Sequence, residues 1–65
     1  MKKEIKEGTI LVATRTDKAT FKGDEYLIKG FSDNNVKFYI DGENGFESYF
    51  VDEINLFFEV KNNIL

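Results

Sequence analysis

The chain has 65 residues and a formal net charge of −3, and it contains no Cys, His or Trp. Without Cys and His, disulfide bonds and the common structural zinc sites are excluded, so a domain of this size has to be stabilised by apolar packing. Hydrophobic residues make up 42% of the chain, and seven Phe and three Tyr supply large buried areas. The length predicts a single domain. We expect its core over residues 8–61, with flexible or docking termini at residues 1–7 and 62–65.

Charge is distributed unevenly along the chain. Residues 1–32 carry seven basic and five acidic side chains, a balance of +2, whereas residues 33–65 carry two basic and seven acidic ones, a balance of −5. An acidic C-terminal half repels a phosphate backbone, which disfavours broad nucleic-acid binding on that side.

The N-terminus has the charged start of a secretory signal but not its apolar segment, because Glu4, Lys6 and Glu7 interrupt it. No apolar run approaches the ~20 residues that a membrane span needs. We therefore expect a cytoplasmic protein with no membrane association.

The first half of the chain predicts two strands joined by a long polar loop. Residues 9–14 (TILVAT) are rich in β-branched side chains, and residues 25–31 (EYLIKGF) alternate between two faces. Between them, residues 15–24 (RTDKATFKGD) form a loop that ends in a tight turn at Gly23. Residues 32–35 (SDNN) predict another turn, because Asp and Asn tolerate a left-handed backbone.

The second half predicts a hairpin, a single helical turn and a last strand. Residues 36–40 and 46–51 flank DGENG, which contains two strong turn dipeptides. The segment VDEIN is too short for a regular helix and predicts one 3-10 turn with Ile54 pointing inward. The last strand is expected over residues 56–61, and no window shows sustained helical spacing of apolar residues.

The register of the hairpin decides which rings are buried, because a shift of one residue exchanges the two faces of a strand. One register pairs Ile40 with Phe46, and the other pairs Asp41 with Phe46. We favour the first, because it fills the core without burying Glu47. The residues that it places in the core are Val36, Phe38, Ile40 and Phe50.

Catalytic and metal chemistry find little support in the residues. No His is present to activate a nucleophile, and Ser32 and Ser48 lie in ordinary turn and strand contexts. The acidic segment 41–52 superficially resembles a calcium loop, but Phe46 stands where that loop needs Gly and its last ligand is Asp52 instead of Glu. The sequence therefore predicts a protein that is not an enzyme and that holds no metal or cofactor.

A surface for a protein partner is expected on the outer side of the hairpin. Exposed rings rimmed by charge are typical of such surfaces. The predicted partner-binding residues are Tyr39, Tyr49, Phe57, Glu43, Glu47 and Asp52. In the alternative interpretation, the N-terminal segment or residues 62–65 cover these rings.

The polar loop supplies a second candidate site, in which an aromatic ring stacks on a base and cations hold its phosphate. Its residues are Arg15, Lys18, Phe21 and Lys22. Asp17, Asp24 and Glu25 cancel the positive charge of this segment. The charge balance favours a solvated loop with Phe21 packed into the mouth of the barrel.

The order of these elements resembles the SH3-like small barrels, above all the short stand-alone versions encoded by bacteriophages and prophages. The likeness covers residues 8–61 and rests on KGDEY, on VKFY followed by a DGxxG hairpin, and on YFVDEINLFFEV. The resemblance implies an all-β, five-stranded barrel with a 3-10 turn before the last strand. The chain has no Trp and no ALYDY-like start, so binding of proline-rich peptides is not implied.

Together these features predict a non-catalytic binding protein of phage or mobile-element type. It would engage a host protein, and it could inhibit that protein by placing acidic side chains where phosphates would lie. One alternative is a nucleic-acid or nucleotide binder that uses the basic loop 15–22. Another is a structural module that forms homo-oligomers through an exposed strand edge.

Overall fold

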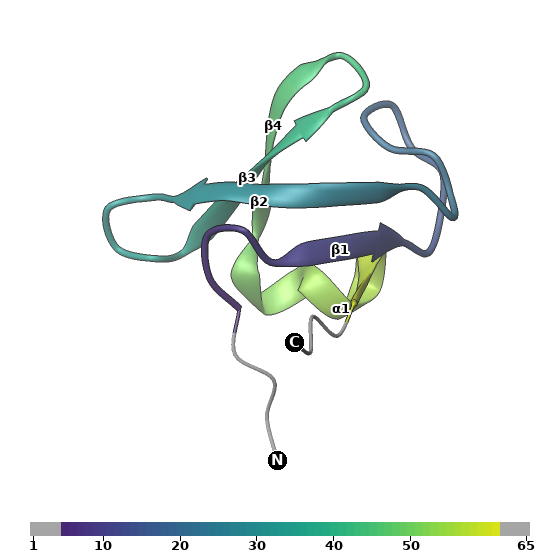
Figure 1. Cartoon of the computed structure of the whole chain (residues 1–65). Coiled ribbons are helices and arrows are strands. Elements are labelled where there is room, and N and C mark those ends of the chain that lie inside the picture. The colour runs from purple at the N-terminus through teal and green to yellow at the C-terminus, as the bar shows by residue number, and fades with distance from the viewer. Residues whose placement is uncertain (1–4, 62–65) are drawn as a thin grey trace.

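The computed structural model describes residues 5–61, in which five strands form one antiparallel sheet with the order β4-β3-β2-β1-β5 (Figure 1). A 3-10 turn and a one-turn helix connect the two strands at opposite ends of this order. The elements are β1 (Ile10–Ala13), β2 (Glu25–Phe31), β3 (Lys37–Gly42), β4 (Gly45–Phe50), η1 (Val51–Glu53), α1 (Ile54–Phe57) and β5 (Phe58–Val60). The prediction of an all-β domain with a short helical turn before the last strand is therefore confirmed.

The strands match the sequence expectations closely except at the last one. The bounds of β2 coincide with the prediction, and the predicted turn at residues 32–35 contains Asn35 with φ 60°. The last strand is shorter than expected, because α1 includes Leu56 and Phe57. Because β4 and β5 do not pair with each other within residues 5–61, the sheet curls around its core without closing into a continuous barrel.

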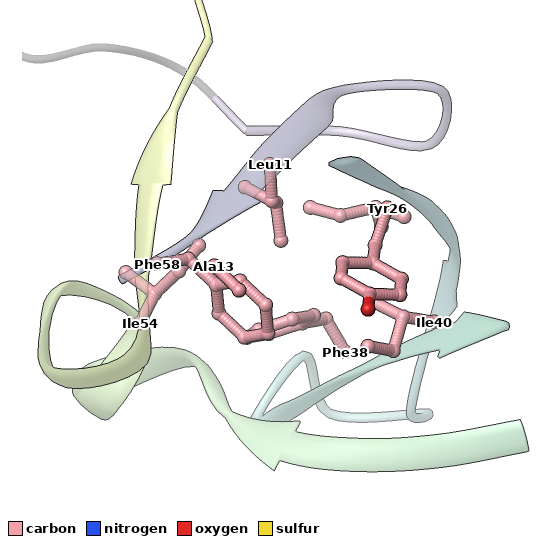
Figure 2. Packing of buried hydrophobic residues seen from close by; sticks show 8 residues of the cluster. Leu11, Ala13, Tyr26, Phe38, Ile40, Ile54 and Phe58 are labelled. Carbon is pink, nitrogen blue, oxygen red and sulfur yellow. The ribbon is translucent and has the colours of Figure 1, made fainter. Parts of the chain in front are cut away.

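The core consists of inward-facing side chains from every strand except β4, together with one from α1. Phe38 is fully buried, and Phe58 meets its ring edge-on at 6.0 Å (Figure 2). Ile54 is buried, as predicted, and Ile5 packs against the margin of the core. The expectations for residues 1–4 and 62–65 lie outside the described residues. The buried hydrophobic cluster comprises Leu11, Ala13, Tyr26, Ile28, Phe38, Ile40, Ile54 and Phe58.

The hairpin adopts the register that we did not favour. Asp41 lies opposite Phe46, and Phe38 lies opposite Tyr49. Val36 and Phe50 were expected in the core, but they are 45% and 46% exposed. We favoured the other register in order to keep Glu47 out of the core. That reason fails because β4 is an edge strand.

At such an edge, a side chain on the inner face still reaches water. Glu47 lies opposite the buried Ile40 and is itself half-buried, so the chosen register does not require an enclosed carboxylate. Gly42 pairs with Gly45, whose φ of 106° suits glycine at the end of the turn.

The tip of the hairpin is packed against the long loop between β1 and β2. The N–H of Glu43 donates to the carbonyl oxygen of Ala19 at 2.7 Å. A Cβ atom on Gly42 would lie 2.7 Å from the same oxygen, which is closer than real Cβ atoms come. Glycine at position 42 therefore permits the close approach of the two segments.

We expect Gly42→Ala to lower the free energy of unfolding by about 1–3 kcal/mol, because the backbone of the loop has to shift away. Gly30→Ala is the matched control, since a Cβ at that strand position meets nothing within 4 Å. Its effect should stay within about 0.5 kcal/mol. Urea denaturation measures both variants, and equal losses would contradict the close approach at Gly42.

Candidate protein-binding surface

The observed register gathers three aromatic side chains on the outer face of the β3–β4 hairpin. Directly opposite residues point to the same side of a sheet, and side chains two apart along a strand do so as well. Tyr39 lies opposite Ser48 and therefore shares its face with Phe46 and Phe50. Phe46 is 71% exposed and Phe50 is 46% exposed, while Tyr39 is half-buried. We call these three residues the outer aromatic face.

The polar residues of this face lie between and above the rings. Lys37 is opposite Phe50 and holds its Nζ atom 4.8 Å from the centre of that ring, within the range of a cation–π contact. Ser48 is opposite Tyr39, and the carboxylate-bearing Asp41 is opposite Phe46. The outer aromatic face thus combines apolar area with charges of both signs.

Acidic residues are concentrated in the segment that carries the outer aromatic face. Residues 37–53 contain one basic residue, Lys37, and five acidic ones, which gives this segment a charge of −4. Asp52 and Glu53 are exposed in η1, immediately after β4. The acidic residues of the segment are Asp41, Glu43, Glu47, Asp52 and Glu53.

Only part of the predicted partner-binding set lies on this face. Tyr39 does, but Tyr49 and Phe57 are half-buried and pack against the core. The ring of Tyr49 stacks on Phe38 at 5.8 Å and lies 5.3 Å from the ring of Phe57. The prediction that Tyr49 and Phe57 form an exposed surface with Tyr39 is therefore wrong.

Two residues of the outer aromatic face, Phe46 and Phe50, were missed for a single reason. The register that pairs Asp41 with Phe46 turns Phe46 and Phe50 outward, and it brings Tyr49 over the core in their place. The two-residue alternation along β4 was therefore recognised correctly, but its two sets of side chains were assigned to the wrong faces of the strand.

The predicted acidic residues occupy three different settings. Glu43 is at the hairpin tip, where its Oε2 accepts a hydrogen bond of 2.8 Å from the hydroxyl of Tyr26. Glu47 is half-buried on the inner side of β4, and Asp52 is exposed in η1. Of the three, Asp52 is the most available to a partner.

Asp17 organises the long loop and attaches it to β4. Its Oδ1 accepts hydrogen bonds from the N–H groups of Ala19 and Thr20, at 2.8 and 2.9 Å, and from the Thr20 hydroxyl at 3.0 Å. Its Oδ2 accepts a hydrogen bond of 3.1 Å from the hydroxyl of Tyr49. Burial acts to raise the pKa of Asp17, but these donors outweigh it and lower the pKa below its ordinary value.

The two inward-facing tyrosines connect the loop to the hairpin. Burial, followed by the hydrogen bond to Asp17 and its charge, raises the pKa of Tyr49 to about 12. The hydroxyl of Tyr26 accepts a hydrogen bond of 2.8 Å from the N–H of Phe21. Burial, together with the bond to Glu43 and its charge, raises the pKa of Tyr26 as well. Both phenols therefore stay protonated and serve as donors.

The residues of the nucleic-acid alternative are all exposed along the long loop. Arg15 places its guanidinium carbon 5.3 Å from the centre of the Phe57 ring. Lys18 contributes its carbonyl oxygen to a hydrogen bond from the side chain of Asn44. Phe21 is 52% exposed, so the expectation that it packs into the barrel mouth is wrong.

Within residues 5–61, no group of three or more His, Cys, Asp or Glu side chains is placed to hold a metal ion. No helix in that part of the chain is long and apolar enough to cross a membrane. No protein-family model, curated protein or solved structure matches the chain. The surface geometry is therefore the basis for proposing a function.

Proposed function

We propose that the protein is a non-catalytic binding module that engages a protein partner through the outer aromatic face and the acidic residues around it. The observation that supports this proposal is the exposure of Phe46 and Phe50 on one face, beside Tyr39. Rings at the centre of an interface supply much of its binding energy, and a charged rim sets partner choice. With a charge of −4 over residues 37–53, the complementary partner surface is basic.

The test compares two substitutions that remove exposed apolar side chains from different places. Phe46→Ser combined with Phe50→Ser removes two rings of the outer aromatic face, whereas Leu56→Ser removes an equally exposed side chain from α1. Quantitative affinity capture from cells that naturally contain the protein should show one partner retained by the native chain and by Leu56→Ser. The double variant should capture at least about tenfold less of this partner, a change of about 1.4 kcal/mol in the free energy of binding.

The native chain and the double variant should unfold at similar denaturant concentrations, because neither ring is buried in the core. A partner that the double variant retains in full would contradict the proposal. So would equal loss of the partner in the double variant and in Leu56→Ser.

The proposal extends to a role as an inhibitor of a host protein, in a module of phage or mobile-element type. Its support is the acidity of the C-terminal half together with the resemblance to phage-encoded barrels. Glu47→Lys combined with Asp52→Lys reverses two charges of the acidic segment 37–53 without touching the Glu43–Tyr26 hydrogen bond. Capture of the partner that survives this reversal unchanged would remove the inhibitory extension.

Binding of nucleic acid is a second candidate function, and the exposure of Phe21 between Lys18 and Lys22 favours it. An exposed ring with neighbouring cations can stack on a base of a single strand. Fluorescence anisotropy with labelled single-stranded oligonucleotides at low salt tests it directly. Phe21→Ala should abolish a signal that arises from this loop, and the absence of any signal would end this candidate.

A further inference from the structure

The outer edge of β4 is an unpaired strand edge within the described part of the chain. β4 is the terminal strand of the sheet, and its only neighbour is β3. It is six residues long, whereas β5, at the opposite end, has three. β4 is therefore the longer of the two terminal strands.

The pairing pattern shows which backbone groups point outward from β4. In an antiparallel ladder, hydrogen-bonded pairs alternate with pairs whose N–H and C=O groups point away from each other. The N–H of Val51 donates to the carbonyl of Val36 at 2.8 Å, which places this pair in the hydrogen-bonded set. Counting back by two from Val51, the backbone groups of Tyr49 and Glu47 also face β3. The N–H and C=O groups that point outward therefore belong to the residues in between, which are Phe46, Ser48 and Phe50.

Natural edge strands are commonly protected by lysine, proline, a bulge or short length. β4 has neither lysine nor proline, its pairing with β3 is regular from Lys37 to Gly42, and its one charged residue is Glu47. The inner side of this edge is already filled, because the Tyr49 ring lies 5.0 Å from that of Phe58. An added strand would therefore extend the sheet alongside β4 without entering the core.

We propose that the partner supplies an extended, lysine- or arginine-rich segment that adds to the edge of β4 as a sixth strand. Strand addition joins backbone groups to backbone groups, while alternate side chains set the specificity. On the outer side those side chains would meet Phe46 and Phe50, and on the inner side they would meet Glu47. This inference rests on the proposed function and specifies the form that the partner takes.

Charge identifies the occupant as a basic segment and not a second copy of this chain. In an antiparallel β4–β4 dimer centred on Ser48, Glu43 of one copy would lie opposite Glu53 of the other. Two segments of charge −4 would also be brought side by side. The same acidic residues attract a basic strand, so the charge of the hairpin favours a basic partner segment.

The probe is a seven-residue peptide in which Lys and Val alternate, and its control carries Glu in place of Lys. Two further versions have N-methyl groups on all the Lys or on all the Val residues, because each removes the N–H donors of one edge only. Amide hydrogen exchange by NMR should show new protection at Phe46, Ser48 and Phe50 with the Lys peptide and none with the Glu peptide. One N-methylated version should retain binding, and the other should lose it.

A substitution in the protein provides an independent test of strand addition at β4. The N–H of Ser48 points away from β3, so Ser48→Pro removes a donor of the open edge while leaving the ladder intact. It should weaken peptide binding about tenfold, whereas Ser48→Ala should not.

Three results would overturn this inference: no binding of the Lys peptide, binding without the alternating protection, or β4 protected by self-association in sedimentation equilibrium. The capture experiment with Phe46→Ser and Phe50→Ser is scored separately. If it succeeds while the peptide experiments fail, the outer aromatic face binds its partner without strand addition.

Discussion

Replacing Phe38 by alanine should lower the free energy of unfolding by about 3–5 kcal/mol, the range found for removing a buried Phe side chain. Phe38 has no exposed surface, and its ring contacts Tyr49 and Phe58. Domains of this size are commonly stabilised by only a few kcal/mol, so we expect most molecules of this variant to be unfolded at room temperature. Circular dichroism and urea denaturation measure the loss.

Phe46→Ala is the matched control, because it makes the same chemical change on the outer face of the hairpin, at a ring that is 71% exposed. Its effect should stay within about 0.5 kcal/mol. A large loss in Phe46→Ala would show that β4 turns its other face to the core, and a small loss in Phe38→Ala would contradict the burial of the Phe38 ring.

The second large effect is expected at Asp17. Asp17→Ala removes the acceptor of four hydrogen bonds, and it leaves the N–H groups of Ala19 and Thr20 and the Tyr49 hydroxyl without that partner. We expect a loss of about 2–3 kcal/mol, since hydrogen bonds to a charged group are stronger than neutral ones. The side chain is half-buried, which limits the loss. Asp33→Ala, at an exposed turn position, is the control.

This contribution should depend on pH in a defined direction. Because the folded state lowers the pKa of Asp17, the stabilisation is complete above the unfolded value of about 3.9 and is lost as pH falls through the folded pKa. The difference in stability between the native chain and Asp17→Ala should therefore be constant near neutral pH and shrink below about pH 4. A difference that stays constant down to pH 2 would show that Asp17 acts without its charge.

Most of the fold could be predicted because local signals agreed with one another. β-branched residues, two-residue alternation and Gly or Asn at turns marked the strands, and Ile54 was correctly placed inside. The register of the hairpin could not be predicted in the same way. Both registers put apolar residues on each face of β3 and β4, so alternation alone did not distinguish them.

The choice between the registers depended on tertiary information. We expected the observed register to bury Glu47, but strand order makes β4 an edge, and strand order depends on the whole chain. The same error changed the predicted binding surface. An aromatic and acidic outer face was expected, and one exists, but Phe46 and Phe50 form it in place of Tyr49 and Phe57. The role of Asp17 was missed as well, since its partner Tyr49 is 32 residues away in sequence.

The register of the β3–β4 hairpin determines the outer aromatic face, and cross-strand NMR contacts measure it directly. Across an antiparallel pair, the Hα atoms of non-hydrogen-bonded partners approach closely enough for strong nuclear Overhauser effects. We predict such effects between the Hα atoms of Asp41 and Phe46, and between those of Tyr39 and Ser48. Strong effects between the Hα atoms of residues 39 and 47 and of residues 37 and 49 would contradict the account, because they belong to the other register, in which Phe46 and Phe50 face the core.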